Sequence, residues 1–355
     1  MASPATTTSP SEPVSPEDLA RLTWNYSRMG QHVSPEHTTP LTDAIDVHAH
    51  FVTPRLRSAM HAAGHGRPDG MPAIPDWSPQ AALEAMDNTG IAAALLSVSS
   101  PGVHFGDDTA ARELARAVNE EGAAHVDTHP HRFGLLASLP LPDLSGALAE
   151  VRHAFDILGA DGITLHTHYA GRYLGDPCYE PLMAELDQRA AAVLLHPASP
   201  LCWETTSMRL PRPMLEFPFE TTRAVTGLIL NGVLDRYPAI RFIVPHAGAT
   251  LPALADRISA FSIAVSDSPV DVLGHLRRLH YDLAGFALPR LLPALLTLTD
   301  ADHLFYGSDY PFTPDWVVHG LAEALARDEA LTAEQQRAMQ RQSAAALFPR
   351  LAPSD

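Results

Sequence analysis

Eight short apolar segments, separated by stretches with helical patterning, constrain the fold of this chain more than any other feature. The segments fall at residues 44–48, 91–98, 133–139, 161–168, 191–196, 240–246, 279–285 and 303–309. Continuous apolar runs of this length are typical of parallel strands that are buried on both faces. Eight strand–helix units in about 300 residues predict a (β/α)8 barrel, the TIM barrel of the α/β class.

The intervening stretches carry helix signals. Ser78 followed by Pro79 is a typical helix start, with a capping hydroxyl and a proline in the first turn. Further helices are expected at about 109–126, 144–158, 179–189, 219–236, 250–264, 287–298, 316–328 and 332–347. The alternative is a doubly wound open sheet, which would place a glycine-rich phosphate loop after the first strand. The sequence there is HAHFVTP, so the barrel is favoured.

The first 43 residues differ in composition from the rest of the chain. Residues 1–15 are rich in Ser, Thr, Pro and Ala and lack apolar periodicity, which predicts disorder. Residues 16–43 are expected to be a segment able to associate with the body. We therefore divide the chain into an N-terminal extension, 1–43, and a single barrel domain, 44–355.

Charge and cysteine content exclude several classes of partner. The chain carries 24 Lys and Arg against 41 Asp and Glu, a formal net charge of −17. Such a chain repels polyanions, so neither nucleic acid nor an anionic membrane surface is an expected partner. Two cysteines, Cys178 and Cys202, cannot form a disulfide framework, which predicts a reducing, cytoplasmic compartment. We find no transmembrane run and no signal peptide.

Polar side chains that bind metals or protons stand at the ends of several predicted strands. His48 and His50 end the first strand, and residues two apart on a strand point the same way, roughly 6.5 Å apart. His196 ends the fifth strand, His246 the sixth and Asp309 the eighth. The carboxyl ends of barrel strands meet at one face, where such barrels build their active sites.

Each of these residues alone would be unremarkable as a buried or surface side chain, but together they indicate a metal site. Two imidazoles at i and i+2 can both bind one cation at about 2.0–2.1 Å. A buried Asp309 is costly unless it is paired or bound to a metal. Three imidazoles and one carboxylate suit one Zn²⁺ per chain, and Mn²⁺ is a further option. The high histidine count, 19, agrees with metal or proton chemistry.

Four ordered motifs, IDVHAHF, LLHP, VPHAG and YGSDYPF, resemble the amidohydrolase superfamily. Within it they are most similar to the aminocarboxymuconate-semialdehyde decarboxylase branch, over about residues 44–350. The stretches SSPGVHFGDD, HTHYAGRYLGDP and RPMLEFPFETTRAV look most like the 6-methylsalicylate decarboxylase group of that branch. The resemblance implies a metal-dependent barrel enzyme that releases CO2 without oxidation.

The resemblance also implies roles for individual residues. His48, His50, His196 and Asp309 match the metal ligands, and His246 matches a histidine beside the metal that transfers protons. Asp309 and His246 are therefore the two candidate catalytic acids, and the sequence does not choose between them. Binuclear members carry a bridging lysine on the fourth strand, but residues 161–171 contain none, which favours one metal. His166 and His168 stand there instead, as core residues or as contacts to substrate or a second metal.

Substrate contacts are predicted from their positions near the strand ends. The expected substrate is a small aromatic or muconate-like carboxylic acid, with a 2-hydroxybenzoate such as 6-methylsalicylate favoured. Arginines could pair its carboxylate, and aromatic rings could stack on it. The candidates are Phe51, His104, His168, Arg172, Tyr173, Trp203, Arg209, Arg212, Phe217 and Asp282.

Two other functions remain open at this level. A hydrolase acting on a lactone or amide would use the same ligands and His246, although the missing lysine speaks against it. A noncatalytic, metal-storing barrel is the second alternative. By analogy with the family we expect a homodimer or homotetramer, with 210–225 as a contact segment.

Overall fold

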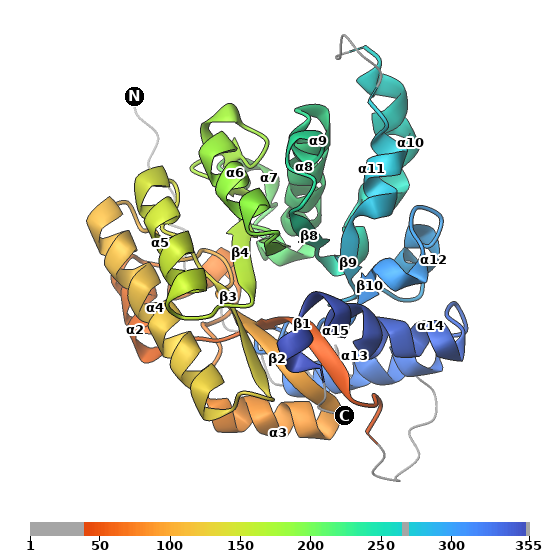
Figure 1. Ribbon diagram of the computed structural model, residues 1–355, viewed down its shortest axis with the longest axis horizontal. Helices are drawn as coiled ribbons and strands as arrows, with labels where there is room; N and C mark the ends of the chain where they lie inside the picture. The colour runs from red at the N-terminus through yellow and green to blue at the C-terminus, as the bar shows by residue number, and fades with distance from the viewer. Residues whose placement is uncertain (1–38, 265–269, 353–355) are drawn as a thin grey trace, which may run out of the picture. The chain divides into compact units, whose positions relative to one another are not determined.

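A closed parallel barrel forms the centre of the fold (Figure 1). The computed structural model describes residues 39–264 and 270–352. The strands follow in the order β1 (Ala44–His50), β2 (Ile91–Ser97), β3 (Phe133–Ala137), β4 (Gly162–His166), β7 (Ala192–His196), β8 (Arg241–Val244), β9 (His280–Asp282) and β10 (Leu304–Phe305). A parallel bridge between Asp46 and Tyr306 joins the last strand region to the first. The sheet therefore closes, which confirms the TIM barrel and excludes the open sheet.

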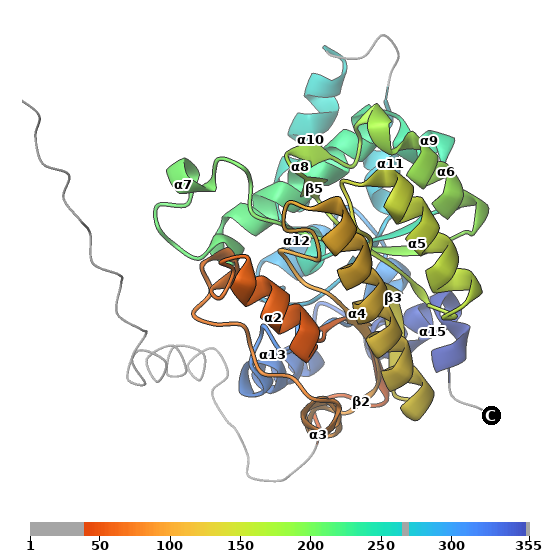
Figure 2. The ribbon, with the colours of Figure 1, turned by 90° about the vertical axis from the view of Figure 1, so that its left-hand side faces the viewer.

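Helices surround the sheet (Figure 2). They are α2 (Pro54–Ala62), α3 (Pro79–Thr89), α4 (Asp108–Thr128), α5 (Leu144–Asp156), α6 (Glu180–Gln188), α7 (Trp203–Thr206), α8 (Glu216–Leu230), α9 (Val233–Arg236), α10 (Leu251–Ser262), α11 (Val272–Arg278), α12 (Leu291–Leu295), α13 (Asp315–Arg327), α14 (Ala333–Arg337) and α15 (Ser343–Leu347). A small antiparallel hairpin, β5 (His168–Tyr169) and β6 (Arg172–Tyr173), follows β4.

Two predicted helices differ from the observed ones. The helix expected over 219–236 is divided into α8 and α9, because Gly232 adopts a left-handed conformation with φ of +67°. The helix expected over 287–298 is reduced to α12, since Pro289 supplies no N–H and the regular turns begin only after it.

Side-chain caps start the major helices directly after the strand loops. The Ser78 hydroxyl accepts a hydrogen bond from the N–H of Ala81 at 3.1 Å, as its sequence predicts. Asp107 caps α4 and Asp143 caps α5 in the same way. These caps satisfy backbone N–H groups that have no partner inside the helix. Each of these helices therefore starts at a defined residue. Because the strands are parallel, all their carboxyl ends face one side of the barrel.

The barrel interior has its own apolar core. Ile45, Leu95, Leu194 and Phe305 point inward from four strands, and Phe348 packs against them from the end of α15. A second, larger core lies between the sheet and the helices. Side chains alternate along a strand, so every second residue points into the barrel. Above the interior core, at the carboxyl ends of the strands, these inward positions carry polar groups.

The predicted N-terminal extension falls mostly outside the described residues. Disorder over 1–15 therefore stays a prediction. Leu41 is buried, and its N–H donates to the carbonyl of Thr89 at 3.1 Å. The barrel body thus includes residues shortly before Ala44.

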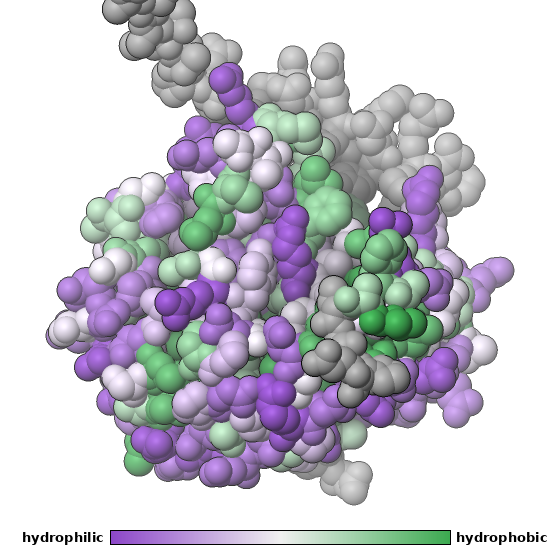
Figure 3. All heavy atoms as spheres, turned by 90° about the horizontal axis from the view of Figure 1, so that it is seen from above, coloured by the Kyte–Doolittle hydropathy of each residue, from purple (hydrophilic) through white to green (hydrophobic). Residues whose placement is uncertain are grey.

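The described surface is polar with apolar interruptions. The face in Figure 3 is mainly hydrophilic and is interrupted by apolar patches. Among the described residues, no helix is both long and apolar enough to cross a bilayer. Cys178 and Cys202 are both free thiols, as expected.

His280, at the start of β9, gives a test of acid stability. Its ring stacks on Phe305 at 5.1 Å, and its Nδ1 atom is buried without a partner in the described part of the chain. Burial, together with the nearby charges of His303 and Arg241, lowers the pKa of His280 to about 4. The unfolded chain keeps the ordinary value near 6.5, so it binds more protons between these two values and stability falls as the pH is lowered through them.

We predict that His280→Gln removes about 2–3 kcal/mol of this acid destabilisation between pH 6.5 and 4. Urea unfolding at several pH values measures it. His131→Gln, on an exposed histidine, is the control and should leave the profile unchanged. A wild-type profile in His280→Gln would contradict the assignment.

Candidate metal centre

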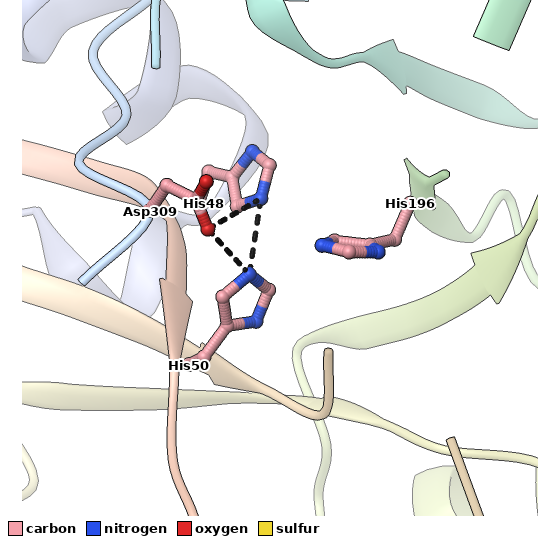
Figure 4. Close-up of side chains that lie close together, drawn as sticks. All are labelled: His48, His50, His196 and Asp309. Carbon is pink, nitrogen blue, oxygen red and sulfur yellow. Dashed lines mark hydrogen bonds and ion pairs between the residues drawn. The ribbon is translucent and has the colours of Figure 1, made fainter. Parts of the chain in front are cut away.

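Four side chains from three parts of the barrel converge at the carboxyl ends of the strands (Figure 4). His48 and His50 come from β1, His196 ends β7, and Asp309 follows β10. One ligand atom from each lies within 4.8 Å of the others. The three imidazoles are buried, and the side chain of Asp309 is 21% exposed. The structure therefore brings these four residues, predicted from the sequence, into one cluster.

The distances fit a shared cation. The Nε2 atoms of His48 and His50 lie 3.2 Å apart, and His50 Nε2 lies 3.1 Å from Asp309 Oδ1. Ligand atoms about 2.1 Å from one cation at angles of 90–110° would be roughly 3.0–3.4 Å apart. His196 faces this group from the other side in Figure 4. The closest pairs therefore have the spacing of ligands on one divalent metal, and all ligand atoms of this donor set lie within 4.8 Å of one another.

Hydrogen bonds donated by the Nδ1 atoms set the tautomers of the β1 histidines. His48 Nδ1 donates to the Asp282 carboxylate at 2.9 Å. His50 Nδ1 lies 2.8 Å from the Ser97 hydroxyl, which itself donates to the carbonyl of Ala49 and so accepts from the ring. Both rings therefore carry their proton on Nδ1 in the metal-binding tautomer.

His196 follows the same rule with a different acceptor. Its Nδ1 donates to the carbonyl of Pro197 at 2.8 Å. Its Nε2 lies 3.3 Å from the Ser99 hydroxyl, at the side of the four-residue cluster. Three Nε2 lone pairs thus face one region. Between neutral rings these lone pairs would repel each other, and either a cation or a proton on His48 relieves that repulsion.

The backbone around the ligands is fixed by Asp46. The carboxylate Oδ1 of Asp46 accepts hydrogen bonds from the N–H groups of His48 and Ser308, each at 3.0 Å. The register of β1 against β2 shifts between Asp46 and Ala49. This irregularity aims two neighbouring histidines at one point and ties them to the loop that carries Asp309.

Charges at the site oppose the effect of burial. Burial acts to lower the pKa of His48, but the charge and hydrogen bond of Asp282 outweigh it and raise the pKa to about 9. Burial acts to raise the pKa of Asp309, but hydrogen bonds from His246 and His50 hold it well below its usual range. Asp309 is therefore ionised at neutral pH, and a cation would replace a proton on His48.

His246 stands beside the cluster. Its Nε2 lies 3.6 Å from Asp309 Oδ2, and its side chain is 20% exposed. Both residues have left-handed backbones, with φ of +56° at His246 and +57° at Asp309. Strained, non-glycine positions of this kind cluster at functional sites. The pair forms the solvent-accessible side of the centre.

Two predicted substrate residues prove to be placed behind the site. Phe51 is buried in the core against Trp77, with ring centroids 5.9 Å apart, so it cannot stack on a ligand. Asp282 is fully buried, and its oxygens bind His48 and the N–H groups of His246 and Ala284. Asp282 therefore orients the site and does not contact substrate. The sequence alone did not show whether these two side chains face the open side of the site or pack behind it.

The other predicted contacts lie in varied positions. Phe217 is beside His196, with ring centroids 6.1 Å apart. Arg212 is half-buried; its Nε donates to Ser199 and it stacks over Trp203 at 4.2 Å.

The remaining predicted contacts are either exposed or bonded away from the cluster. His104 binds Asp108 at 2.9 Å, at the start of α4. His168 donates to the carbonyl of Ser199. The Tyr173 hydroxyl donates to the carboxylate of Glu220. Arg172 and Arg209 are exposed on the surface.

Several residues at the site escaped the sequence analysis. Ser97 and Ser99 orient or flank ligand histidines, and Phe312 lies 5.6 Å from the ring of His50. Phe312 could have been found because it stands three residues after Asp309 in the YGSDYPF motif. The serines gave no signal, since their roles depend on which neighbouring strand they face.

A comparison with protein families matches residues 45–350 to the family described as Amidohydrolase. The chain belongs to the amidohydrolase family. Among its curated relatives is a 6-methylsalicylic acid decarboxylase of Aspergillus aculeatus, 37% identical over 325 residues, which cover 86% of this chain and 96% of the relative.

Solved structures agree on the fold. A crystal structure of amidohydrolase II superposes with a TM-score of 0.83 and 38% identity, covering 86% of this chain and 99% of that one. A dihydroxybenzoic acid decarboxylase from Polaromonas, solved with manganese and 2-nitroresorcinol, has a TM-score of 0.75 and 23% identity, covering 88% and 98%. At that identity the second match supports the barrel fold alone.

We predict that His196→Ala abolishes stoichiometric metal binding, because it removes one of four ligands. Asp282→Asn removes a charged acceptor from His48 and should weaken cation affinity about 10- to 100-fold. In wild type the affinity should fall as pH is lowered, because the cation competes with the His48 proton. Metal content and competition titration measure these effects.

Asp108→Asn is the matched control, since Asp108 also binds a histidine, His104, at 2.9 Å but lies outside the cluster. It should leave metal affinity unchanged. Full metal content in His196→Ala would overturn the ligand set.

Proposed function

We propose that this protein is a metal-dependent, non-oxidative decarboxylase, a carboxy-lyase that releases CO2 from a hydroxybenzoate, with 6-methylsalicylate as the favoured substrate. The observation that carries this proposal is the cluster of three imidazoles and one carboxylate beside His246. The similarity to a 6-methylsalicylic acid decarboxylase over most of both chains supports the substrate class.

The cation would be held by His48, His50, His196 and Asp309. We favour Zn²⁺ for the nitrogen-rich donor set. Mn²⁺ is the alternative, supported by the carboxylate ligand and by the manganese in the Polaromonas decarboxylase structure. When bound, the metal supplies a positive centre for the oxygens of the substrate and for the charge that develops on them.

The side chains of this chain handle the proton. Decarboxylation of a hydroxybenzoate requires a proton at the ring carbon that carries the carboxylate, and loss of CO2 from that carbon then restores aromaticity. Because Asp309 is ionised and has no proton to give, we assign proton donation to His246, whose Nε2 lies 3.6 Å from Asp309 Oδ2. The proton reaches the ring from His246 directly or through Asp309.

Two aromatic side chains would hold the substrate ring. Phe217 lies 6.1 Å from His196 and Phe312 lies 5.6 Å from His50, ring centroid to ring centroid, so they flank two ligands. Their apolar edges favour an aromatic substrate over a polar one. The half-buried guanidinium of Arg212 is the candidate for an anionic group of the substrate.

The proposal predicts CO2 release with a phenol as the second product. A panel of hydroxybenzoates, including 2-hydroxy-6-methylbenzoate, should be assayed for both products with metal content measured on the same sample. His246→Ala should keep its metal and lose about 10²- to 10⁴-fold in kcat/KM, equivalent to about 3–5 kcal/mol of barrier.

His319→Ala is the control, because His319 is exposed on α13 and should not affect turnover. Acid formation from lactones without CO2 release would instead identify a hydrolase. Loss of metal in His246→Ala would make His246 a ligand and reverse the division of roles.

We also propose that the protein forms a homodimer or homotetramer. The segment from Leu201 to Phe219 runs from the loop after β7 into the first turn of α8, and it extends away from the ring of helices near α7 (Figure 2). Its exposed large apolar side chains are Leu201, Trp203, Met208, Leu210, Met214, Leu215 and Phe219. Exposed apolar side chains gathered on one segment are typical of a protein interface.

Introducing charge at two of these positions, in Met208→Glu with Met214→Glu, should weaken self-association at least about tenfold, since both charges would be buried at the interface. Analytical ultracentrifugation measures it. Ile157→Glu, which places a charge on an equally exposed apolar residue after α5, is the matched control. A monomeric wild type would contradict the proposal.

A further inference from the structure

His166 ends β4, one strand away from the ligand His196. The register pairs His166 with His196 and Thr164 with Leu194, so each pair shares one face of the sheet. Leu194 belongs to the interior core. The side chain of His166 therefore points into the barrel at the same level as a metal ligand, and the two ring centroids lie 5.8 Å apart.

The ring of His166 is buried, with 7% of the residue exposed, and one of its nitrogens makes no hydrogen bond within the described part of the chain. The ring makes one hydrogen bond to the backbone of Val98. Its Nε2 has no partner among the described residues, so Nδ1 makes the Val98 bond as a donor. Nε2 is then a lone pair without a donor, which destabilises a folded protein.

The surrounding loop is built to accommodate this ring. A Cβ on Gly102 would lie 2.5 Å from His166 Cε1, so only glycine fits beside the imidazole. Gly102 also has φ of +84°, which glycine adopts without strain. The same loop carries Ser99, whose hydroxyl lies 3.3 Å from His196 Nε2. The loop thus joins His166 to the edge of the metal centre.

We propose that Nε2 of His166 accepts a hydrogen bond from a hydroxyl group of the aromatic substrate and thereby selects hydroxylated arenes. The inference rests on the proposed function for the kind of ligand. A buried acceptor without a donor destabilises the empty protein, and a substrate hydroxyl would pair it in the complex. A ligand that lacks the hydroxyl would leave the acceptor unpaired and would bind less tightly. His166 is in this reading a specificity-determining residue and not a metal ligand.

The test compares two ligands in two proteins. Calorimetry on the metal-loaded protein measures binding of 2-hydroxy-6-methylbenzoate and of 2,6-dimethylbenzoate, which lacks the hydroxyl. His166→Leu should weaken binding of the first about 5- to 20-fold and leave binding of the second within about twofold. His166→Gln, which retains an acceptor oxygen, should recover most of the loss.

Stability gives a readout that separates this role from a purely structural one. His166→Leu removes an unpaired buried acceptor but also the hydrogen bond to Val98, so the two effects offset and the melting temperature should change by no more than about 4 °C. His303→Leu is the matched control, because His303 also has a buried ring nitrogen without a partner in the described chain but lies before β10, at the opposite strand end. Its effect on stability should be similarly small, and it should not affect ligand discrimination.

The outcomes are distinct. Equal weakening for both ligands, or loss of metal from His166→Leu, would overturn the role of His166 even if CO2 is released. Discrimination that depends on His166 in a protein that releases no CO2 would support this role and reject the proposed reaction. A large fall in the melting temperature of His166→Leu with unchanged discrimination would make His166 a core residue.

Discussion

The orientation of three imidazole rings governs the chemistry available at the mouth of this barrel. Each ring has its Nδ1 proton fixed by a different acceptor, the carboxylate of Asp282, the hydroxyl of Ser97 and the carbonyl of Pro197. The Nε2 atoms of the three rings therefore face one region. Three neutral rings would place mutually repelling lone pairs together, and a cation, or a proton on His48 in its place, makes this arrangement favourable.

Asp282 links the two halves of the proposed chemistry. One of its oxygens holds His48, and the other accepts from the backbone N–H of His246 at 3.0 Å. A single buried carboxylate thus contacts both the ring of a candidate ligand and the backbone of the candidate proton-transfer residue. This explains why His246 can occupy a strained backbone conformation: the bond to Asp282 helps to compensate its cost.

Much of this arrangement could be predicted from sequence because it depends on local patterns. Apolar runs indicated the strands, and the residues at or just after their ends, such as His196 and Asp309, are ones that the structure brings into the four-residue cluster. Phe51 and Asp282 show the limit of this approach. Both lie near strand ends, but Phe51 points outward to α4 and Asp282 lies behind His48. Which way a side chain faces after a bulge or a short strand depends on register with neighbours distant in sequence.

The floor of the barrel has a consequence for biosynthesis. Phe348 and Leu351 complete the interior core together with Ile45 from the first strand, so residues about 300 positions apart share one apolar space. A ribosome releases Ile45 long before Phe348 is made. The interior core of the nascent chain therefore stays incomplete until its last helix is made. The four-residue cluster, which combines residues from the first strand with Asp309 after the last, can form only late in synthesis.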